Sequence, residues 1–227
     1  MKPSLMNAPA HHRPALTLGE GIFTVQDMAR ILRLPAPKIR SWLNRYWDSR
    51  FGKHSWGVHQ TKAVNFHTLV EFYVTLLLKE AGVPSRAIFK AHDQLSALFH
   101  TSFPFAHREV LTGLLCDGKR IYLDTQEGVV SLDGTNQLNL DFIRDFLRNI
   151  EFGEDLLASK LYPRGKDSAI VVDPQRQFGH PVVENTNIHP ETLYSLHLGG
   201  EPISFIASIY QIPEQAVRDA IDFCKAA

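Results

Sequence analysis

Residues 23–47 read FTVQDMARILRLPAPKIRSWLNRYW, and this stretch decides the fold of the N-terminal part of the chain. Thr24 is a suitable N-cap residue for a helix that begins at Val25. The apolar residues that follow have the i, i+3, i+4, i+7 spacing of a helix with one buried side: Val25, Met28, Ala29 and Leu32. Pro35 disfavours a helical Leu34, and Pro37 suits the first turn of a second helix. Two short helices joined by a turn of three or four residues predict a helix-turn-helix.

The second helix combines one apolar stripe with polar and basic residues on its other faces. The predicted stripe is Ile39, Trp42, Leu43 and Tyr46. The polar and basic residues are Lys38, Arg40, Ser41, Asn44 and Arg45. Such side chains can contact phosphates and base edges when a helix enters the major groove of DNA. The pattern favours DNA binding, and the alternative is a helical hairpin with a purely structural role.

Residues 48–66 are predicted to form a β-hairpin, or wing, with a basic tip. This segment contains Gly52 and Gly57 and the basic residues Arg50, Lys53 and His54. A wing that follows a recognition helix lies along the phosphate backbone, where Lys and Arg add salt-sensitive affinity. The complete set of predicted DNA-binding residues is Thr24, Lys38, Arg40, Ser41, Asn44, Arg45, Arg50, Lys53 and His54. Beyond the wing, apolar spacing predicts a helix from Leu69 that ends near Gly82 and another that begins at Pro84.

Charge is unevenly distributed along the 227 residues, although Lys and Arg together equal Asp and Glu at 24 each. Residues 1–62 contain ten basic and three acidic residues and have a net charge of +7. Residues 63–165 contain ten basic and thirteen acidic residues, a net charge of −3, and residues 166–227 contain four and eight, a net charge of −4. A basic first part beside an acidic remainder is typical of a nucleic-acid-binding domain joined to a protein-binding domain. Ordinary variation of surface charge is the alternative.

The first hundred residues resemble a MerR-type winged helix. The likeness depends on Phe23-Thr24-Val25, on KIRSWLNRYW at Lys38–Trp47, and on the wing and helix that end near Gly82. MerR proteins bind operator DNA as dimers, so the resemblance implies that residues 38–45 form the recognition helix of a homodimer. Two family features are missing: a long antiparallel dimerisation helix and a cluster of cysteine ligands. The metal-sensing role of the family is therefore not carried over.

The remainder of the chain is predicted to be a central α+β unit followed by three short helices. Between residues 101 and 175, turn residues such as Asp117-Gly118 separate short β-rich runs that include Val110–Leu115, which suggests a small antiparallel sheet. Leu140, Ile143, Leu147 and Ile150 predict a helix, and Ile170–Val172 predict a further strand. Pro190, Pro202 and Pro213 each stand at the start of a helical pattern, and Gly199-Gly200 ends the first.

The predicted fold is thus α+β and mainly α, with four parts. Residues 1–20 are a flexible arm, 21–100 a winged helix, 101–175 a connecting unit, and 176–227 a three-helix domain in which the last two helices form a second helix-turn-helix.

The last fifty residues resemble a small domain of unknown function that occurs in predicted antitoxins of bacterial toxin–antitoxin pairs. The matching stretches are FGHPVVENTNIHPETL at 178–193, GGEPISFIASIY at 199–210 and IPEQAVRDAIDF at 212–223. Where family members often have Gly-Thr-Arg, this chain has Asn185-Thr186-Asn187. The missing arginine and the negative charge indicate that the C-terminal domain contacts a second copy or a partner protein, and not that it is a second DNA-binding site.

No pattern of catalytic or metal-binding residues is found in the sequence. The eleven histidines include no i, i+4 pair with a companion carboxylate, and Cys116 and Cys224 form no ligand pattern or disulfide framework. Nucleophile elbows, Walker loops and dinucleotide turns are missing as well. We therefore expect that the protein is not an enzyme and that it binds neither a metal ion nor a cofactor. We also expect a reducing, cytoplasmic location without signal peptide or membrane span.

Three interpretations of function remain open. The first is a DNA-binding antitoxin that acts as a homodimer, represses its own operon and inhibits a toxin by binding it. By family analogy that toxin is a PIN-type ribonuclease encoded next door. The second is an effector-responsive MerR-like regulator with a ligand pocket in residues 101–175. A hydrolase that uses the histidine-rich loops is the third.

Overall fold

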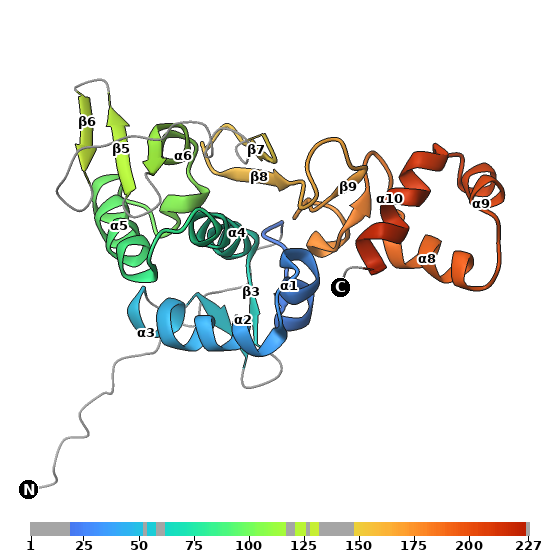
Figure 1. Ribbon diagram of the computed structural model, residues 1–227, viewed down its shortest axis with the longest axis horizontal. Helices are drawn as coiled ribbons and strands as arrows, with labels where there is room; N and C mark the ends of the chain where they lie inside the picture. The colour runs from blue at the N-terminus through green and yellow to red at the C-terminus, as the bar shows by residue number, and fades with distance from the viewer. Residues whose placement is uncertain are drawn as a thin grey trace, which may run out of the picture.

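The structure is a computed structural model that describes residues 19–51, 54–57, 62–116, 121–125, 128–131 and 148–225. For residues 115–116, 122–125 and 128–131 it describes the backbone alone. The described chain is a mainly helical α+β protein with small antiparallel sheets. In Figure 1, residues 21–100, here called the head, occupy the middle and left of the molecule. Residues 170–225, here called the C-terminal unit, form its right-hand end.

The head begins with two short helices against a three-stranded sheet. Strand β1 (Phe23–Thr24) leads into α1 (Val25–Leu32) and α2 (Ala36–Trp42), and α2 continues through a π-helical turn (Leu43–Trp47) into α3 (Asp48–Arg50). Strands β2 (Ser55–Trp56) and β3 (Ala63–Val64) form a hairpin, and β3 lies between β1 and β2. The helix that begins after Thr24, the helix that begins after Pro35 and the following hairpin all agree with the sequence pattern.

The π-helical turn changes which aromatic residues are buried. A π-helical turn contains more residues than an α-helical turn, so Tyr46, three positions after Leu43, is rotated away from the side of Leu43, whereas Trp47, four positions after it, stays there. Both are fully buried, and Trp47 stacks on Phe72 with ring centroids 4.0 Å apart. Tyr46 is half-buried and stacks on Phe89. The sequence pattern predicted Tyr46 as the core residue, whereas Trp47 occupies that place.

Two longer helices complete the head. Helix α4 (Phe66–Glu80) is buried on several sides, and α5 (Ser85–Leu98) packs beside it. The fully buried Glu71 of α4 accepts a hydrogen bond from the Phe105 amide at 2.8 Å. Its other carboxylate oxygen lies 2.6 Å from His92 Nε2 on α5. A buried carboxylate is tolerated here because both of its oxygens have a partner.

The central part contains two small sheets. A 3-10 turn (Pro104–Ala106) and α6 (Arg108–Gly113) precede β4 (Leu114–Cys116), which pairs with β5 (Ile121–Thr125), and β5 pairs with β6 (Gly128–Ser131). Strands β7 (Ile150–Phe152) and β8 (Ala158–Leu161) form the other sheet.

Two sequence predictions about this part are wrong. Residues 110–113 are helical because Val110, Leu111 and Leu114 have helical spacing and are all buried, and only Leu114 and Leu115 of the predicted run are extended. Ile150 belongs to β7 and not to a helix, because β7 pairs with β8. The other residues of that predicted helix, 140–147, lie outside the described residues, as does the predicted flexible arm apart from residues 19–20.

The C-terminal unit is a β-hairpin followed by three packed helices. Strand β9 (Ile170–Val171) pairs with β10 (Val182–Val183), so this hairpin spans the domain boundary predicted at 175–176. Between them lies a 3-10 turn (Gln177–Gly179). Helices α8 (Pro190–Leu198), α9 (Ile203–Tyr210) and α10 (Glu214–Lys225) follow and pack on one another. Their prolines and glycines lie where the sequence pattern required them. No helix of the described chain is long and apolar enough to span a membrane.

Candidate nucleic-acid interface

The outer side of α2 and of the π-helical turn is polar and basic. Ile39 and Leu43 are fully buried, and this fixes the rotation of the helix about its axis. Lys38, Asn44 and Arg45 are consequently exposed, while Arg40 and Ser41 are half-buried. The structure therefore brings these five predicted residues together on one helical segment, within a single stretch of eight residues.

The two arginines of this segment have different surroundings. Arg45 is exposed, and its carbonyl accepts a hydrogen bond from Ser49 Oγ at 2.5 Å. Arg40 is half-buried, and its Nε is buried without a hydrogen-bond partner among the described residues. A buried guanidinium nitrogen without a partner is costly in the free protein.

Lys62 adds a basic group that the sequence analysis did not select. Its Nζ donates to Asn44 Oδ1 at 2.6 Å and to Asp48 Oδ2 at 2.5 Å. Asp48 also accepts from the Ser55 amide at 3.1 Å and from Ser55 Oγ at 2.6 Å. Asp48 thus connects the helix to both strands of the hairpin. The sequence signal for Lys62 was its position within the predicted wing, immediately before the returning strand.

Two of the residues predicted for the wing lie elsewhere. Arg50 belongs to α3 and forms an ion pair with Asp93 of α5, with Nη2 and Oδ2 2.5 Å apart. Its guanidinium remains half exposed, but it is not on the tip of the hairpin. His54 is buried, lies 3.1 Å from the Phe51 carbonyl and meets the edge of Phe103. Burial lowers the pKa of His54 below its usual value, so the ring favours the neutral form.

This position of His54 corrects the prediction that it contributes to a basic DNA-facing tip. Lys53 and residues 58–61, which include the end of the hairpin, lie outside the described residues.

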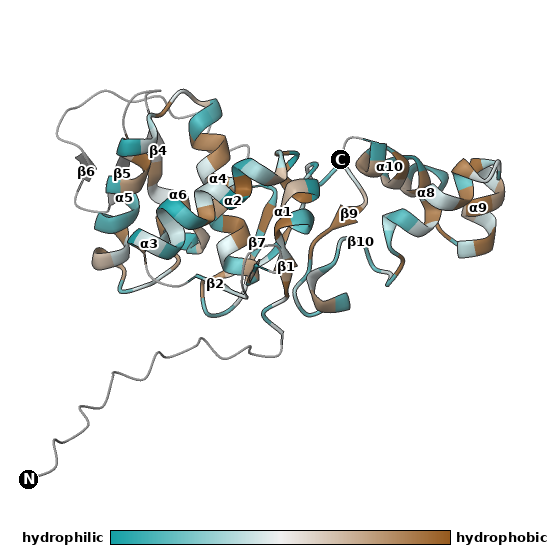
Figure 2. Ribbon diagram, turned by 90° about the horizontal axis from the view of Figure 1, so that it is seen from below, coloured by the Kyte–Doolittle hydropathy of each residue, from teal (hydrophilic) through white to brown (hydrophobic). Residues whose placement is uncertain are grey.

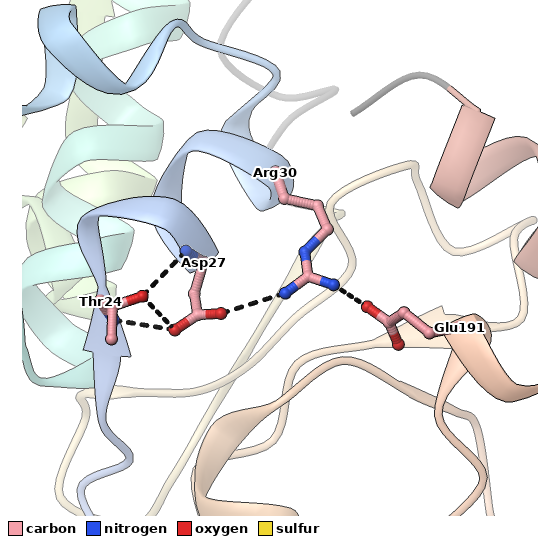
Figure 3. A network of polar contacts seen from close by, with 4 residues as sticks. All are labelled: Thr24, Asp27, Arg30 and Glu191. Carbon is pink, nitrogen blue, oxygen red and sulfur yellow. Dashed lines mark hydrogen bonds and ion pairs between the residues drawn. The ribbon is translucent and has the colours of Figure 1, made fainter.

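Thr24 caps α1, and its hydroxyl is occupied in doing so. Thr24 Oγ1 accepts from the Asp27 amide at 3.2 Å and donates to Asp27 Oδ2 at 2.6 Å, while the Thr24 amide donates to the same oxygen at 2.9 Å. Figure 3 shows that this capping box continues outward, because Arg30 bridges Asp27 and Glu191 of α8. The predicted Thr24 site therefore has a structural role in the free protein and joins the head to the C-terminal unit.

A second arginine joins the same two parts from a more buried position. Arg164 donates to the carbonyls of Ile31 at 2.9 Å and Arg30 at 3.3 Å, at the end of α1, and its guanidinium lies 4.9 Å from the ring centre of Phe223. Burial, reinforced by the nearby Arg33, lowers the pKa of Arg164 to about 10. Surface ion pairs such as Arg30–Glu191 contribute little stability, so Arg164 is the stronger connection.

A polar cluster on the central sheet resembles a catalytic site in composition but not in its protonation states. Tyr162 donates towards Glu151 at 3.1 Å and Glu184 at 2.7 Å, and burial together with these carboxylates raises its pKa. Burial opposes the ionised form of Glu151, but hydrogen bonds from Lys166, Lys160 and Tyr162 lower its pKa to about 2. A phenol that keeps its proton beside a carboxylate that has lost its own forms a fixed hydrogen bond, not an acid–base pair.

The cavity beside this cluster has a volume of about 20 Å³ and is lined by Lys160, Tyr162, Asp173 and Glu184 among others. Small-molecule sites usually measure about 300 to 1,000 Å³, so this cavity has the size of a water molecule. This cavity is therefore too small to hold an effector. Within the described ranges, no three His, Cys, Asp or Glu side chains lie close enough together to hold a metal ion.

Comparison with known proteins gives three findings. Residues 170–224 match the profile of a family described as "Protein of unknown function (DUF433)". The protein named "Putative antitoxin VapB45" of Mycobacterium tuberculosis is 22% identical over 228 residues, which cover 88% of this chain and 92% of that protein. The X-ray crystal structure of Rv2018 from the same organism superposes with a TM-score of 0.67 and 20% identity, covering 88% of this chain and 97% of the other.

These likenesses extend over most of the chain, although the identity is low. This chain therefore shares its fold with a solved protein, and the likeness covers nearly the whole length of that protein. The C-terminal hairpin and helices of this chain form a DUF433 domain, in a protein distantly related to one that is named as an antitoxin.

Proposed function

We propose that this protein is a DNA-binding antitoxin. In this proposal two copies bind operator DNA through the helical stretch Lys38–Arg45, here called the α2 segment, and repress the operon. The same protein binds and so neutralises a neighbouring toxin of the PIN-type ribonuclease class. The observation that carries the proposal is the joint exposure of Lys38, Asn44 and Arg45 on a helix that follows a short turn. The distant relative that is named as an antitoxin supports the second half.

The geometry suggests how the α2 segment would bind DNA. A helix that enters the major groove places exposed arginines where they can donate to guanine or to phosphate. Asn44 pairs with adenine through both its amide oxygen and its amide nitrogen. Lys62 donates to Asn44 Oδ1 in the free protein, but an amide oxygen has two lone pairs, so Asn44 can accept from adenine as well, and a phosphate is a suitable further partner for Lys62.

The toxin half of the proposal needs no catalytic residue. The C-terminal unit lies in the acidic part of the chain, with a net charge of −4 over residues 166–227. A ribonuclease binds polyanionic RNA and therefore presents a basic groove, which an acidic surface can cover. Inhibition then results from occupying the substrate groove.

DNA binding is tested by fluorescence anisotropy with DNA from upstream of the gene, titrated with salt and with scrambled competitor DNA. We expect selective binding with a steep salt dependence. Arg40→Ala and Arg45→Ala should each weaken binding. Loss of a phosphate contact should reduce the salt slope by about one, and loss of a base contact should cost about 1 to 3 kcal/mol and relax specificity.

Arg108→Ala is the matched control, because Arg108 is an exposed arginine of α6 that belongs neither to the residues predicted to bind DNA nor to helix α9. Its DNA affinity should equal that of the wild type. If Arg40→Ala and Arg45→Ala also bind like the wild type, the assignment of the recognition helix is wrong. Co-expression with the product of the neighbouring gene tests the other half: a stable complex without ribonuclease activity is expected, and separate purification of the two proteins would contradict the proposal.

A further inference from the structure

Helix α9 presents large apolar side chains to solvent at the far end of the molecule. Phe205 is 49% exposed and Ile209 is 56% exposed, and Leu198 at the end of α8 is 67% exposed. The opposite side of α9, with Ile206 and Ala207, is buried against α8 and α10. We call the exposed surface the α9 face; it consists of Leu198, Ser204, Phe205, Ser208 and Ile209.

The α9 face is free of charge within an acidic part of the chain. Residues 202–213, PISFIASIYQIP, contain no Asp, Glu, Lys, Arg or His. The surrounding residues 166–227 contain eight acidic and four basic residues. Two acidic surfaces repel each other, and around a two-fold axis the same surface of both copies meets. A stretch without charge is therefore the place where two copies of this unit can meet without bringing like charges together.

The spacing of the residues also suits a helix that packs against its own copy. Ser204 and Ser208 are four residues apart, and so are Phe205 and Ile209, which gives adjacent small and large i, i+4 rows on one helix. Ridges of this kind pack into the grooves of a second helix, and the small row allows close approach. An open depression of about 500 Å³ lies beside the N-terminal end of α9, and because its lining includes Glu201, Glu214 and Arg218, it marks the polar edge of this face.

The position of the helix leaves room for a second copy. Figure 1 places α9 at the end of the molecule away from the head, and Figure 2 shows the same arrangement after a turn of 90°. In both views α2 lies towards the middle of the molecule, apart from α9, so a second copy packed on α9 would leave α2 accessible.

From these observations we infer that the α9 face is the surface through which two copies of this chain associate around a two-fold axis. Standard interfaces bury about 800 Å² on each partner, and three large side chains provide only the apolar centre of such an area. The loops at 199–202 and 211–213 must supply the rim, and the dimer should form in a concentration-dependent way. The inference deepens the proposed function, which needs two copies on an operator, but it can be tested without DNA.

Sedimentation velocity of the full chain over a range of concentrations tests the interface. The wild type should shift from monomer to dimer as its concentration rises. Phe205→Glu and Ile209→Glu should each raise the dimer dissociation constant by at least about tenfold, because each places a carboxylate without a partner in the interface. Both side chains are about half exposed, so the variants should keep the far-ultraviolet circular dichroism of the wild type.

Leu98→Glu is the matched control, because Leu98 is another large apolar residue, 59% exposed, but lies at the end of α5. It should leave the dimer dissociation constant unchanged. A wild type that stays monomeric overturns the inference, as does a dimer that tolerates both α9 substitutions. Selective DNA binding by such a protein would still support the proposed function, whereas a dimer through α9 without DNA binding would contradict the proposed function alone.

Discussion

The turn between α1 and α2 and the turn between α9 and α10 share one backbone conformation. Arg33 has φ 52° and ψ 42°, and Gln211 has φ 53° and ψ 43°. Each is followed by an apolar residue and a proline, Leu34-Pro35 and Ile212-Pro213. In both turns the amide of the apolar residue donates to an alanine carbonyl of the preceding helix, at 3.0 Å to Ala29 and 3.1 Å to Ala207.

The surfaces that these two turns support are different. The helix after the first turn exposes Lys38, Asn44 and Arg45 through its continuation, whereas the helix after the second exposes Glu214, Arg218 and Asp222. The helix before the second turn is uncharged, whereas α1 carries Asp27 and Arg30. One local geometry thus presents a basic surface at one end of the chain and an apolar and acidic one at the other. Function follows from the surface residues, and the turn alone does not determine it.

The two regions also differ in their interiors. The buried residues of α8, α9 and α10 are all apolar. Of the buried polar residues in the described part of the chain, only Asp173 lies outside the head. The head therefore buries several polar side chains, among which Glu71 has a partner for each carboxylate oxygen, whereas the three C-terminal helices depend on apolar packing.

The largest effect should follow from removing the central polar contact of the head. Glu71→Ala leaves both His92 Nε2 and the Phe105 amide without a partner in the interior. We expect the free energy of unfolding to fall by about 3 to 5 kcal/mol, because each buried group without a partner costs about 1 to 3 kcal/mol. Urea denaturation followed by tryptophan fluorescence reports on the head directly, since Trp42, Trp47 and Trp56 all lie there.

Glu71→Gln is the control for this measurement, because a glutamine can still accept the hydrogen bond from the Phe105 amide. Its loss of stability should be smaller than that of Glu71→Ala. A Glu71→Ala protein as stable as the wild type would show that the head does not depend on its buried polar contacts, and the contrast between the two interiors would fail.

A smaller effect is expected at the junction of the two regions. Gly179 has φ +91°, and a Cβ there would lie 2.4 Å from Cζ of Phe23 in β1. Gly200 has φ +96°, but a Cβ there would meet no atom within 4 Å. Gly179→Ala should lower the free energy of unfolding by about 2 to 4 kcal/mol, from backbone strain and steric overlap together. Gly200→Ala should cost only about 1 kcal/mol, from the backbone.

Comparing Gly179→Ala with Gly200→Ala separates steric overlap from backbone strain, because both glycines have a positive φ but a Cβ would overlap Phe23 only at Gly179. Adding Phe23→Leu to Gly179→Ala should recover part of the loss in urea denaturation, since the overlapping ring is removed. Equal losses for the two alanine variants would mean that the junction is loosely packed.

Local sequence signals predicted the two turn regions well. Thr24, Pro35 and Pro37 mark the ends of α1 and α2, and Pro190, Gly199, Pro202 and Pro213 mark those of α8 to α10. These residues act through their own backbone or that of close neighbours, so the sequence pattern contains the necessary information.

Contacts between distant residues could not be predicted in the same way. His54 is buried because Phe103, about fifty residues later, packs on it. Asp48 accepts hydrogen bonds from Ser55 and Lys62, and Arg30 reaches Glu191 across 161 positions of the sequence. In the π-helical turn the core residue is Trp47 and not Tyr46, and Trp47 stacks on Phe72 of the distant helix α4. Of the candidate site, the exposed α2 residues followed from spacing, whereas the positions of Arg50, His54 and Lys62 depend on tertiary packing.

The smallest expected effect compares the two turns directly. Arg33 and Gln211 have a left-handed conformation that costs residues with a Cβ about 1 to 2 kcal/mol, and glycine avoids this cost but loses more entropy on folding. Arg33→Gly and Gln211→Gly should therefore each raise the free energy of unfolding by about 0.5 to 1 kcal/mol. Urea denaturation monitored by circular dichroism detects both changes.

The two turns have the same backbone geometry. A difference between Arg33→Gly and Gln211→Gly in the free energy of unfolding would therefore measure the contribution of the surrounding residues. Arg33 lies near Arg164 and disfavours its charged form, so Arg33→Gly should stabilise the protein more than Gln211→Gly does. Arg33→Gln places the residue of the second turn in the first, keeps the left-handed backbone and removes the charge. Its gain in stability should equal the excess of Arg33→Gly over Gln211→Gly. If Arg33→Gln gains nothing while the excess persists, the two turns differ in backbone energy despite their matching angles.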